Sequence, residues 1–449
     1  LGINEHALIY APEDLVVKAD LANVIYNEDG KLKCAHLALS DNADFAAPRT
    51  FKAATISYDR QFEQGVKTTL TLPFTMAVPA GAKAYQFVGD ITDAVLIKPV
   101  DVMEANQPYV FVADADMTLG TNVETEVLAV PNHMPKVEGA NFAVSSTLAT
   151  ISGADAKQQG MYLLGADNSW IMADADGSVL PYRAYIQARV SKPEIVMYEA
   201  IDEMTIADGT MTEFENLEEK YVGELTYTRN INNTWNALYL PFQLELTADF
   251  LANYDIAAID EVLGYDNNED GVLDAWEVVV IKLKNIAKLE ANHPYVIRPK
   301  NAEAMSLVIQ QNGSILHSTL PEKQQAVKGE SAHLNYVIKG VYAKTQSQYL
   351  ENGNYVYAVN KTGVWQKMAP ETSLIPFRLY MMLTDKNGND VTISSQSVKM
   401  NLVDGTTGIS DLEVNKSQNG DMIYDLQGRR VYAPKKGNLY IVNGKKVLF

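Results

Sequence analysis

Cysteine is nearly absent from this chain of 449 residues, which contains only Cys34. A single thiol cannot form a disulfide within the chain, and it cannot build the common structural zinc sites, which require two or more thiolates. Cys34 lies in the alternating run Leu32-Lys33-Cys34-Ala35-His36-Leu37, which is typical of a β-strand. We therefore predict a buried, unreactive thiol and a fold that depends on the burial of apolar side chains.

Basic residues and long hydrophobic runs are also scarce. The chain has 37 Lys and Arg against 56 Asp and Glu, a formal net charge of -19. Nucleic-acid binding is therefore not expected, because a phosphate backbone attracts Lys and Arg. No apolar run approaches the roughly eighteen residues of a transmembrane helix. The 47% of hydrophobic residues is ordinary for a globular protein, so disorder is not expected either.

The common catalytic motifs are missing as well. The sequence has no Gly-x-Ser-x-Gly, no His-Glu-x-x-His and no glycine-rich phosphate-binding loop, and its six histidines are scattered singly. Carboxylate pairs for glycoside hydrolysis stay open, because 56 acidic residues offer many pairs whose separation the sequence does not give. We predict that the protein is not an enzyme and rank a glycoside-active enzyme third among its functions.

A series of matching motifs indicates an internal duplication. The clearest pair is Glu104-Ala-Asn-Gln-Pro-Tyr-Val-Phe111 and Glu290-Ala-Asn-His-Pro-Tyr-Val-Ile297. Matches that keep one order predict two copies of one structural unit. The other matches are Tyr58-Asp59-Arg60 with Tyr227-Thr228-Arg229, Leu70 to Phe74 with Leu238 to Phe242, Gly160-Met161-Tyr162 with Gly353-Asn354-Tyr355, Trp170 with Trp365, and Pro181 to Tyr185 with Pro376 to Tyr380.

Alternation of apolar and polar residues dominates over helical spacing, as in Lys67 to Leu72 and Asn335 to Tyr342. The clearest helical candidate is short, from Thr247 to Tyr254, with Thr247 as its cap. We predict an all-β fold with two homologous antiparallel β-sandwich modules. The predicted parts are an N-terminal strand segment at 1–30, β-sandwich modules at 31–192 and 200–400, and a small C-terminal β-hairpin domain at 409–449.

The arginines that recur in both copies are Arg60, Arg183, Arg229 and Arg378. They could bind a ligand, but we expect them to support a carboxylate or loop carbonyls within each module, because arginine often serves as a paired structural donor. Trp170 and Trp365 occupy the same position in the two copies, so we expect them to lie in the core or between sheets.

The end of the chain differs in charge from the rest. Residues 416–449 hold seven basic and two acidic residues, a net charge of +5. Because the whole chain carries -19, the residues before 416 carry a net charge of -24. This tail repeats itself, since Tyr424 to Val431 resembles Tyr440 to Val447. The Gln-Gly and Asn-Gly pairs in these two segments suit tight turns, so they predict two small hairpins.

The segment from Ile423 to Leu448 resembles the C-terminal domain of secreted and surface proteins of Bacteroidetes, which is related to the type IX secretion sorting domain. The Leu-Pro-Phe, Asn-x-Pro-Tyr and Pro-Phe-Arg-x-Tyr motifs are similar to repeats in surface proteins of gut members of that phylum. These resemblances imply a β-rich fold and export, through a cleaved leader not present in this chain, to the extracellular space or outer-membrane surface. They imply no catalytic residues.

The sharpest local motif is the acidic segment from Asp266 to Glu277, which fits the twelve-position EF-hand calcium loop. The flanks disagree, because Glu277 to Leu283 is strand-like rather than helical, so the alternative is a solvated hairpin loop that turns at Asp270-Gly271. Calcium is the only cofactor suggested. The oxygen ligands would be Asp266, Asn268, Asp270, the Val272 carbonyl, Asp274 and Glu277.

Trp276 adjoins this loop and has no counterpart in the first copy, so it is the candidate for an exposed, ligand-binding aromatic. A weaker acidic segment, Asp174 to Gly177, is predicted to be a hairpin turn. Together these features predict a monomeric, non-catalytic, exported cell-surface or adhesion-type protein whose ligand is a surface glycan or a protein. The alternative is a glycan-binding protein for polysaccharide capture, with its site in loops at the sandwich ends.

Overall fold

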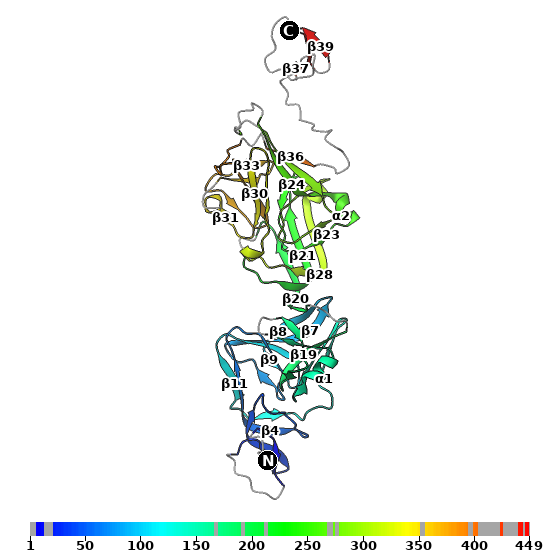
Figure 1. Ribbon diagram of the computed structural model, residues 1–449, viewed down its shortest axis with the longest axis vertical. Helices are drawn as coiled ribbons and strands as arrows, with labels where there is room; N and C mark the ends of the chain where they lie inside the picture. The colour runs from blue at the N-terminus through cyan, green and yellow to red at the C-terminus, as the bar shows by residue number, and fades with distance from the viewer. Residues whose placement is uncertain are drawn as a thin grey trace.

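The computed structural model describes most of the chain, and strands make up 54% and helices 6% of it. The all-β prediction is therefore confirmed. The strands form repeated coils that stack along the long axis of the molecule (Figure 1). The described residues are 6–12, 21–165, 169–189, 194–210, 214–266, 273, 278–350, 355–393, 398–402, 423–424, 439–442 and 445–448.

The first unit contains three main sheets. The first joins β1 (Ile9–Tyr10), β2 (Val24–Glu28), β3 (Lys31–Leu39), β4 (Phe51–Phe62), β11 (Met117–Thr121) and β12 (Thr125–Val127). The second contains β5 (Thr68–Leu70), β10 (Tyr109–Ala113), β7 (Ala82–Ile91) and β8 (Ala94–Val100). The third has β13 (Val137–Glu138), β14 (Phe142–Thr147), β19 (Arg183–Ala188), β16 (Met161–Leu164) and β17 (Trp170–Met172). Smaller elements are β6 (Met76–Ala77) with β9 (Val102–Met103), β15 (Ile151–Ser152) with β18 (Ser178–Val179), and α1 (Gly153–Gln158).

The second unit repeats this order. Its first strands are β20 (Val196–Ala207), β21 (Lys220–Asn230) and β28 (Ser306–Leu316). A second sheet contains β22 (Asn236–Leu238), β27 (Tyr295–Pro299), β24 (Tyr254–Tyr265), β25 (Val278–Asn285) and β36 (Val398–Leu402). A third has β29 (Val327–Glu330), β30 (Asn335–Val341), β35 (Arg378–Thr384), β32 (Val356–Val359) and β33 (Trp365–Lys367). The rest are β23 (Leu244–Glu245) with β26 (Lys288–Leu289), β31 (Thr345–Gln346) with β34 (Ser373–Leu374), α2 (Ala248–Asn253), and the short 3-10 turns η1 (Glu303–Met305), η2 (Pro321–Lys323) and η3 (Ser347–Tyr349).

The sequence predicted two antiparallel β-sandwich modules, but the structure has stacked coils in which some strands pair in parallel. β3 with β4 and β20 with β21 are parallel pairs, and so are β8 with β20 and β25 with β36. The reason is that the strand that leads into each unit does not turn back in a hairpin but is followed by a crossover to its neighbour. Alternation along a strand reports which face is buried, and it carries no information about strand direction.

The two units share one continuous sheet. Residues 196–199 of β20 pair with β8 of the first unit, and residues 199–207 pair with β21 of the second. The result is a seven-stranded sheet in the order β28-β21-β20-β8-β7-β10-β5, with β20 lying between the two bodies in Figure 1. Backbone hydrogen bonds therefore cross the boundary between the repeats.

The Asn-x-Pro-Tyr motif forms a turn that opens a strand in both units. Asn106 and Asn292 have positive φ angles of 63° and 56°, a conformation that asparagine tolerates well. Their N–H groups donate to the carbonyls of Leu72 and Leu240 at 2.7 Å. The tyrosine that follows begins β10 or β27, and its hydroxyl accepts the N–H of the glutamate that starts the motif, at 2.7 Å and 2.9 Å.

The register of the third sheets corrects one of the motif matches. Trp170 pairs with Leu164 in the first unit and Trp365 pairs with Val359 in the second. Counting back two residues, the buried Tyr162 is equivalent to the buried Tyr357 and not to Tyr355. The Gly-x-Tyr match was therefore wrong by two residues, since both segments place a tyrosine close to a glycine.

Two local predictions can also be compared with the structure. The helix expected near Thr247 is α2, and the Thr247 hydroxyl accepts the N–H of Phe250 at 3.2 Å, so this prediction is confirmed. The segment from Asp174 to Gly177 does turn, with the Gly177 N–H donating to the Asp174 carbonyl at 3.2 Å. It is not a hairpin, however, because the flanking β17 and β18 pair with β16 and β15 instead of with each other.

Both faces of the second sheet are covered in the first unit. Alternate residues of β10 point to opposite sides, so Tyr109 and Phe111 join the core beneath the first sheet. Val110 points the other way and packs with Phe142 and Trp170 of the third sheet. The second unit has one large core that spans its sheets and includes the buried Trp365.

Candidate functional site

Each unit contains a buried cluster of one aspartate, one tyrosine and two arginines. In the first unit these residues are Asp41, Tyr58, Arg60 and Arg183. Arg183 Nη1 donates to Asp41 Oδ1 at 3.0 Å, and the Tyr58 hydroxyl donates to the same carboxylate. Arg60 Nη1 donates to the Thr69 carbonyl at 3.0 Å. The cluster thereby ties the turn after β3 to β4, β5 and β19.

The second unit repeats the cluster with Asp208, Tyr227, Arg229 and Arg378. Arg378 Nη1 donates to Asp208 Oδ2 at 2.8 Å, and the Tyr227 hydroxyl donates to the same oxygen at 2.5 Å. Arg229 Nη1 donates to the Ala237 carbonyl at 2.6 Å. Arg183 and Arg378 also donate to the loop carbonyls of Pro181 and Pro376, at 3.2 Å and 3.1 Å. These two arginines support a carboxylate and loop carbonyls as predicted, whereas the carbonyls that Arg60 and Arg229 reach belong to strands β5 and β22.

The electrostatics of the clusters fit a structural role. Burial by itself would raise the pKa of Asp41, but the hydrogen bond and charge of Arg183 lower it below its usual value. Burial raises the pKa of Tyr58 and of Tyr227 well above the ordinary range, so both hydroxyls stay protonated and donate. In the second cluster, Asp208 Oδ1 and Arg229 Nε are buried without a hydrogen bond among the described residues, although Arg229 Nε lies 3.5 Å from Asp208 Oδ2. The ion pairs within each cluster hold elements of the fold together.

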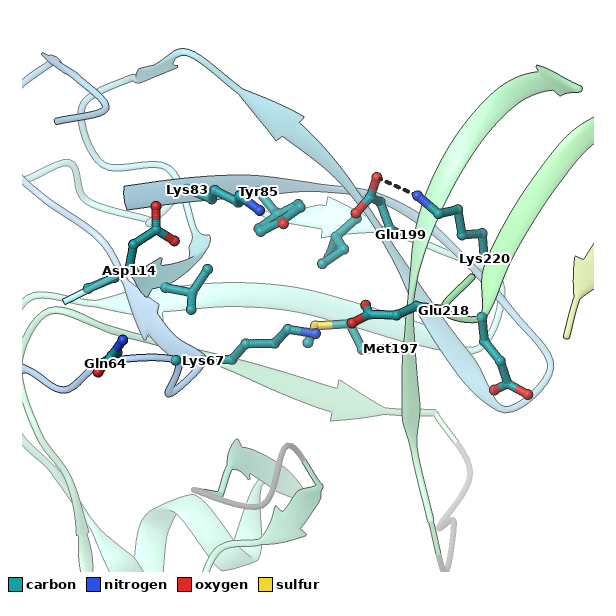
Figure 2. A pocket seen from close by; sticks show the side chains of 14 residues that line it. Gln64, Lys67, Lys83, Tyr85, Asp114, Met197, Glu199, Glu218 and Lys220 are labelled. Atoms are coloured by element: carbon teal, nitrogen blue, oxygen red, sulfur yellow. Dashed lines mark hydrogen bonds and ion pairs between the residues drawn. The ribbon is translucent and has the colours of Figure 1, made fainter. Parts of the chain in front are cut away.

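A separate cleft of about 370 Å³ opens where the two units meet (Figure 2). Its apolar floor is formed by side chains of the shared sheet, on β7, β8, β10 and β20. Lys220 at the start of β21 and the two residues before it close one end. The floor residues are Tyr85, Ile97, Val112 and Met197.

Charged side chains of both signs surround this floor. Lys220 Nζ lies 3.4 Å from Glu199 Oε1, an ion pair drawn in Figure 2. Four others, Lys67, Lys83, Asp114 and Glu218, form no ion pair with any part of the chain that the structure describes. They come from both units: the first three belong to the first repeat and Glu218 to the second. We call these four residues, with the floor, the junction cleft.

The charges around the junction cleft shift the pKa values of Tyr85 and Glu219. Burial raises the pKa of the Tyr85 hydroxyl, and the negative charges of Glu199, Glu218 and Asp114 add to the effect. At the closed end, the His317 ring nitrogen lies 3.2 Å from Glu219 Oε1, and this hydrogen bond lowers the pKa of Glu219. The described residues that line the cleft include no Ser, Thr, Cys or His.

Sequence reasoning did not find the junction cleft. Its lining comes from strands that are far apart in the chain and meet only because β8 pairs with β20. Lys67 and Lys83 look like ordinary surface lysines in the sequence. The only available signal is the start of an alternating run near residue 196, which places a strand across the boundary between the repeats.

The acidic segment from Asp266 to Glu277 lies largely outside the described residues, including Asn268, Asp270, Val272, Asp274, Glu277 and Trp276. Two of its members are described. The Asp266 side chain is only 3% exposed, with Oδ2 4.0 Å from His333 Nδ1. Leu273 is buried and belongs to the core of the second unit. Calcium binding and the role of Trp276 stay predictions.

Cys34 and the described tryptophans behave as expected from their sequence context. Cys34 is 1% exposed, and burial raises the pKa of its thiol to about 11, which leaves no reactive thiolate. Trp170 and Trp365 are buried in equivalent places, and Trp235 is buried beneath the guanidinium of Arg298, whose Cζ lies 4.7 Å from the ring centroid. Their rings are therefore not available as binding platforms.

Among the described residues, no group of three or more His, Cys, Asp or Glu side chains is placed to hold a metal ion. The helices in that part of the chain are too short and too polar to cross a membrane. No protein-family model matches the sequence, and no curated protein resembles it significantly.

Proposed function

We propose that this chain is a non-catalytic, exported surface protein of the adhesion type, built from two homologous β-sandwich modules. The observation that carries the proposal is the shared seven-stranded sheet, which joins the repeats into one elongated body with a ligand-sized cleft at the joint. An elongated, acidic body with a binding cleft suits a protein that projects from a surface to meet a partner. The C-terminal resemblance to a sorting domain supports export in a bacterium of the Bacteroidetes phylum.

The surface location is tested by protease digestion of intact Bacteroidetes cells that express the chain behind a secretion leader. We expect the full chain to be cleaved on intact cells, and a chain that ends at residue 408 to be protected inside them. A control chain with the same deletion, digested after lysis, should be cleaved as readily as the full chain. Protection of the full chain on intact cells would rule out the proposed location.

The junction cleft is the ligand site in this proposal. Unpaired charges of both signs beside an apolar floor fit a protein segment that carries both acidic and basic side chains. Lys83→Glu should therefore abolish retention on an array of extracellular matrix proteins that retains the unchanged chain. Lys344→Glu, an exposed lysine in the second unit, makes the same change of charge elsewhere and should be retained normally. Equal retention of both variants would exclude the junction cleft as the site.

We further propose that the segment from Asp266 to Glu277 binds calcium. The carboxylate and carbonyl oxygens of this segment suit a hard cation, and Leu273 within it is buried in the core of the second unit. Isothermal titration of the purified chain with calcium chloride should show one site, and Glu277→Gln should weaken it. Heat release that is the same for both proteins, or none for either, would contradict this assignment.

A further inference from the structure

A group of exposed side chains on the second unit forms a site distinct from the junction cleft. Tyr355 is 44% exposed. Tyr355 lines a cavity of about 360 Å³ beside β33 and η3, in the part of the second unit where Figure 1 labels β31 and β33. The other lining residues are Ser347, Gln348, Val356, Lys367, Met368 and Pro370.

The duplication shows that the fold does not require this tyrosine or this lysine. With Trp170 equivalent to Trp365, the corrected register places Gly160 at the position of Tyr355. The same register places Met172 at the position of Lys367. The first unit forms the same five-stranded sheet without these two side chains, so the sheet does not require them.

The tyrosine ring is held in place by its surroundings. Lys367 Nζ lies 3.0 Å from the centroid of the Tyr355 ring, a cation–π contact, and 3.4 Å from Thr392 Oγ1. The Tyr355 N–H donates to Asp390 Oδ2 at 3.2 Å. The ammonium group covers one face of the ring, and the large exposed fraction leaves ring surface open to a ligand.

The polar groups beside the ring are also ordered. The Ser347 N–H donates to the Thr372 carbonyl at 2.9 Å, and the Gln348 N–H donates to the Pro370 carbonyl at 3.1 Å. These bonds fix η3, so its exposed side chains start from a defined backbone. The Gln348 side-chain amide donates to Gln346 Oε1 at 3.0 Å in an exposed position. A fixed site loses less conformational entropy when it binds a ligand.

We propose that this site, the tyrosine site, binds a carbohydrate. The CH groups on one face of a pyranose ring pack against an aromatic ring, while its hydroxyl groups need planar amides and other polar groups at the edge. Tyr355 supplies the ring, Gln348 the amide, and Lys367 a donor for a sugar oxygen. The rest of the lining is largely apolar, from Val356, Met368 and Pro370, so the amide and the ammonium group are the polar groups that stand beside the ring.

This proposal rests on the proposed surface function, because glycans are common on the surfaces that such a protein contacts. It adds the chemical class of the ligand. The test is a glycan array probed with the full chain, followed by titration calorimetry with the glycan that it retains most strongly. We expect Tyr355→Ala to lower the affinity about tenfold, the usual cost of removing a central aromatic contact. Lys367→Met, which installs the residue of the first unit, should lower it as well.

Two controls keep the outcome specific. Met172→Ala changes the equivalent exposed position of the first unit and should bind like the unchanged chain. Tyr355 is too exposed for its removal to unfold the protein, and an unchanged near-ultraviolet circular dichroism spectrum checks this. Retention of no glycan, or equal affinity of Tyr355→Ala and the unchanged chain, would overturn the tyrosine site. Neither result would affect protease cleavage on intact cells, so the proposed surface location is judged separately.

Discussion

At the scale of single residues, the two buried clusters explain why the sequence repeats its arginines and tyrosines. The pattern Tyr-x-Arg on one strand places both side chains on one face, where they meet an aspartate from the preceding turn. The second arginine arrives from a strand more than a hundred residues later in the chain. Removing one member therefore leaves a buried charge without its partner. This costs more stability than replacing the whole pair by apolar side chains.

Arg183→Ala should lower the free energy of unfolding by about 3 kcal/mol, because Asp41 would lose its main partner. Arg378→Ala should cost at least as much, since the Asp208 side chain is fully buried whereas the Asp41 side chain is 20% exposed. Urea unfolding followed by circular dichroism measures both. Arg189→Ala breaks an exposed pair with Glu138 and should change stability little. An effect of Arg183→Ala as small as that of Arg189→Ala would contradict the structural role of the cluster.

The lowered pKa of Asp41 predicts a dependence of stability on pH. Because the folded-state pKa lies below the unfolded value of 3.8, the stabilisation is fully present above that value. It is lost as the pH falls through the folded-state pKa. Asp41→Asn should therefore be clearly less stable than the unchanged chain at pH 7, and the difference should shrink at about pH 3. Urea midpoints at the two pH values give the comparison, and a constant difference would assign the effect to packing instead.

At the scale of strands and sheets, the alternation of residues was enough to predict an all-β chain, and the repeated motifs were enough to predict two units. Both signals are local. Pairing is not local, so the parallel contacts of β3 with β4 and of β8 with β20 could not be read from the sequence. The match between Tyr162 and Tyr355 failed for the same reason, because only the cross-strand partners of Trp170 and Trp365 define equivalence. The junction cleft depends on this pairing and was missed with it.

The shared sheet predicts that the two units unfold together. Glu199 is the residue of β20 that pairs with both neighbours, Ile97 on β8 and Lys220 on β21. Proline there lacks the N–H and should cost about 3 kcal/mol or more in the interior of the sheet. Glu199→Pro should therefore split the single calorimetric transition of the unchanged chain into two.

Glu199→Ala is the matched control, because it removes the ion pair with Lys220 and keeps the backbone N–H. This variant should retain one transition with a slightly lower midpoint. If Glu199→Pro also unfolds in one step, the hydrogen bonds across β20 do not couple the units, and their cores alone must do so.

At the scale of the whole molecule, the strands at the two ends of the stacked coils take positions equivalent to those of β8 and β20 at the junction. At the first end, β2 pairs with the start of β3 in the place that β8 takes beside β20. At the other end, β36 pairs with β25 in parallel, as the start of β20 pairs with β8. Within the described residues, β1 and β2 extend the first sheet beyond β3 at one end, and at the other end β36 lies beside β25 as the start of β20 lies beside β8.

The C-terminal part is predicted to be a separate body. β37 (Ile423–Tyr424), β38 (Leu439–Val442) and β39 (Lys445–Leu448) form a three-stranded sheet whose strands pair only with one another among the described residues. Deleting residues 409–449 keeps β36 and every strand before it, so the thermal midpoint of the two units should stay within about 1 °C of that of the full chain, a difference of less than about 1 kcal/mol for a body of this size. Deleting residues 394–449 instead also removes β36 and exposes the edge of β25, which should lower the midpoint clearly. Because β36 pairs with β25 in parallel and its Val398 belongs to the core of the second unit, equal midpoints for the two deletions would show that β36 adds nothing to the stability of that unit.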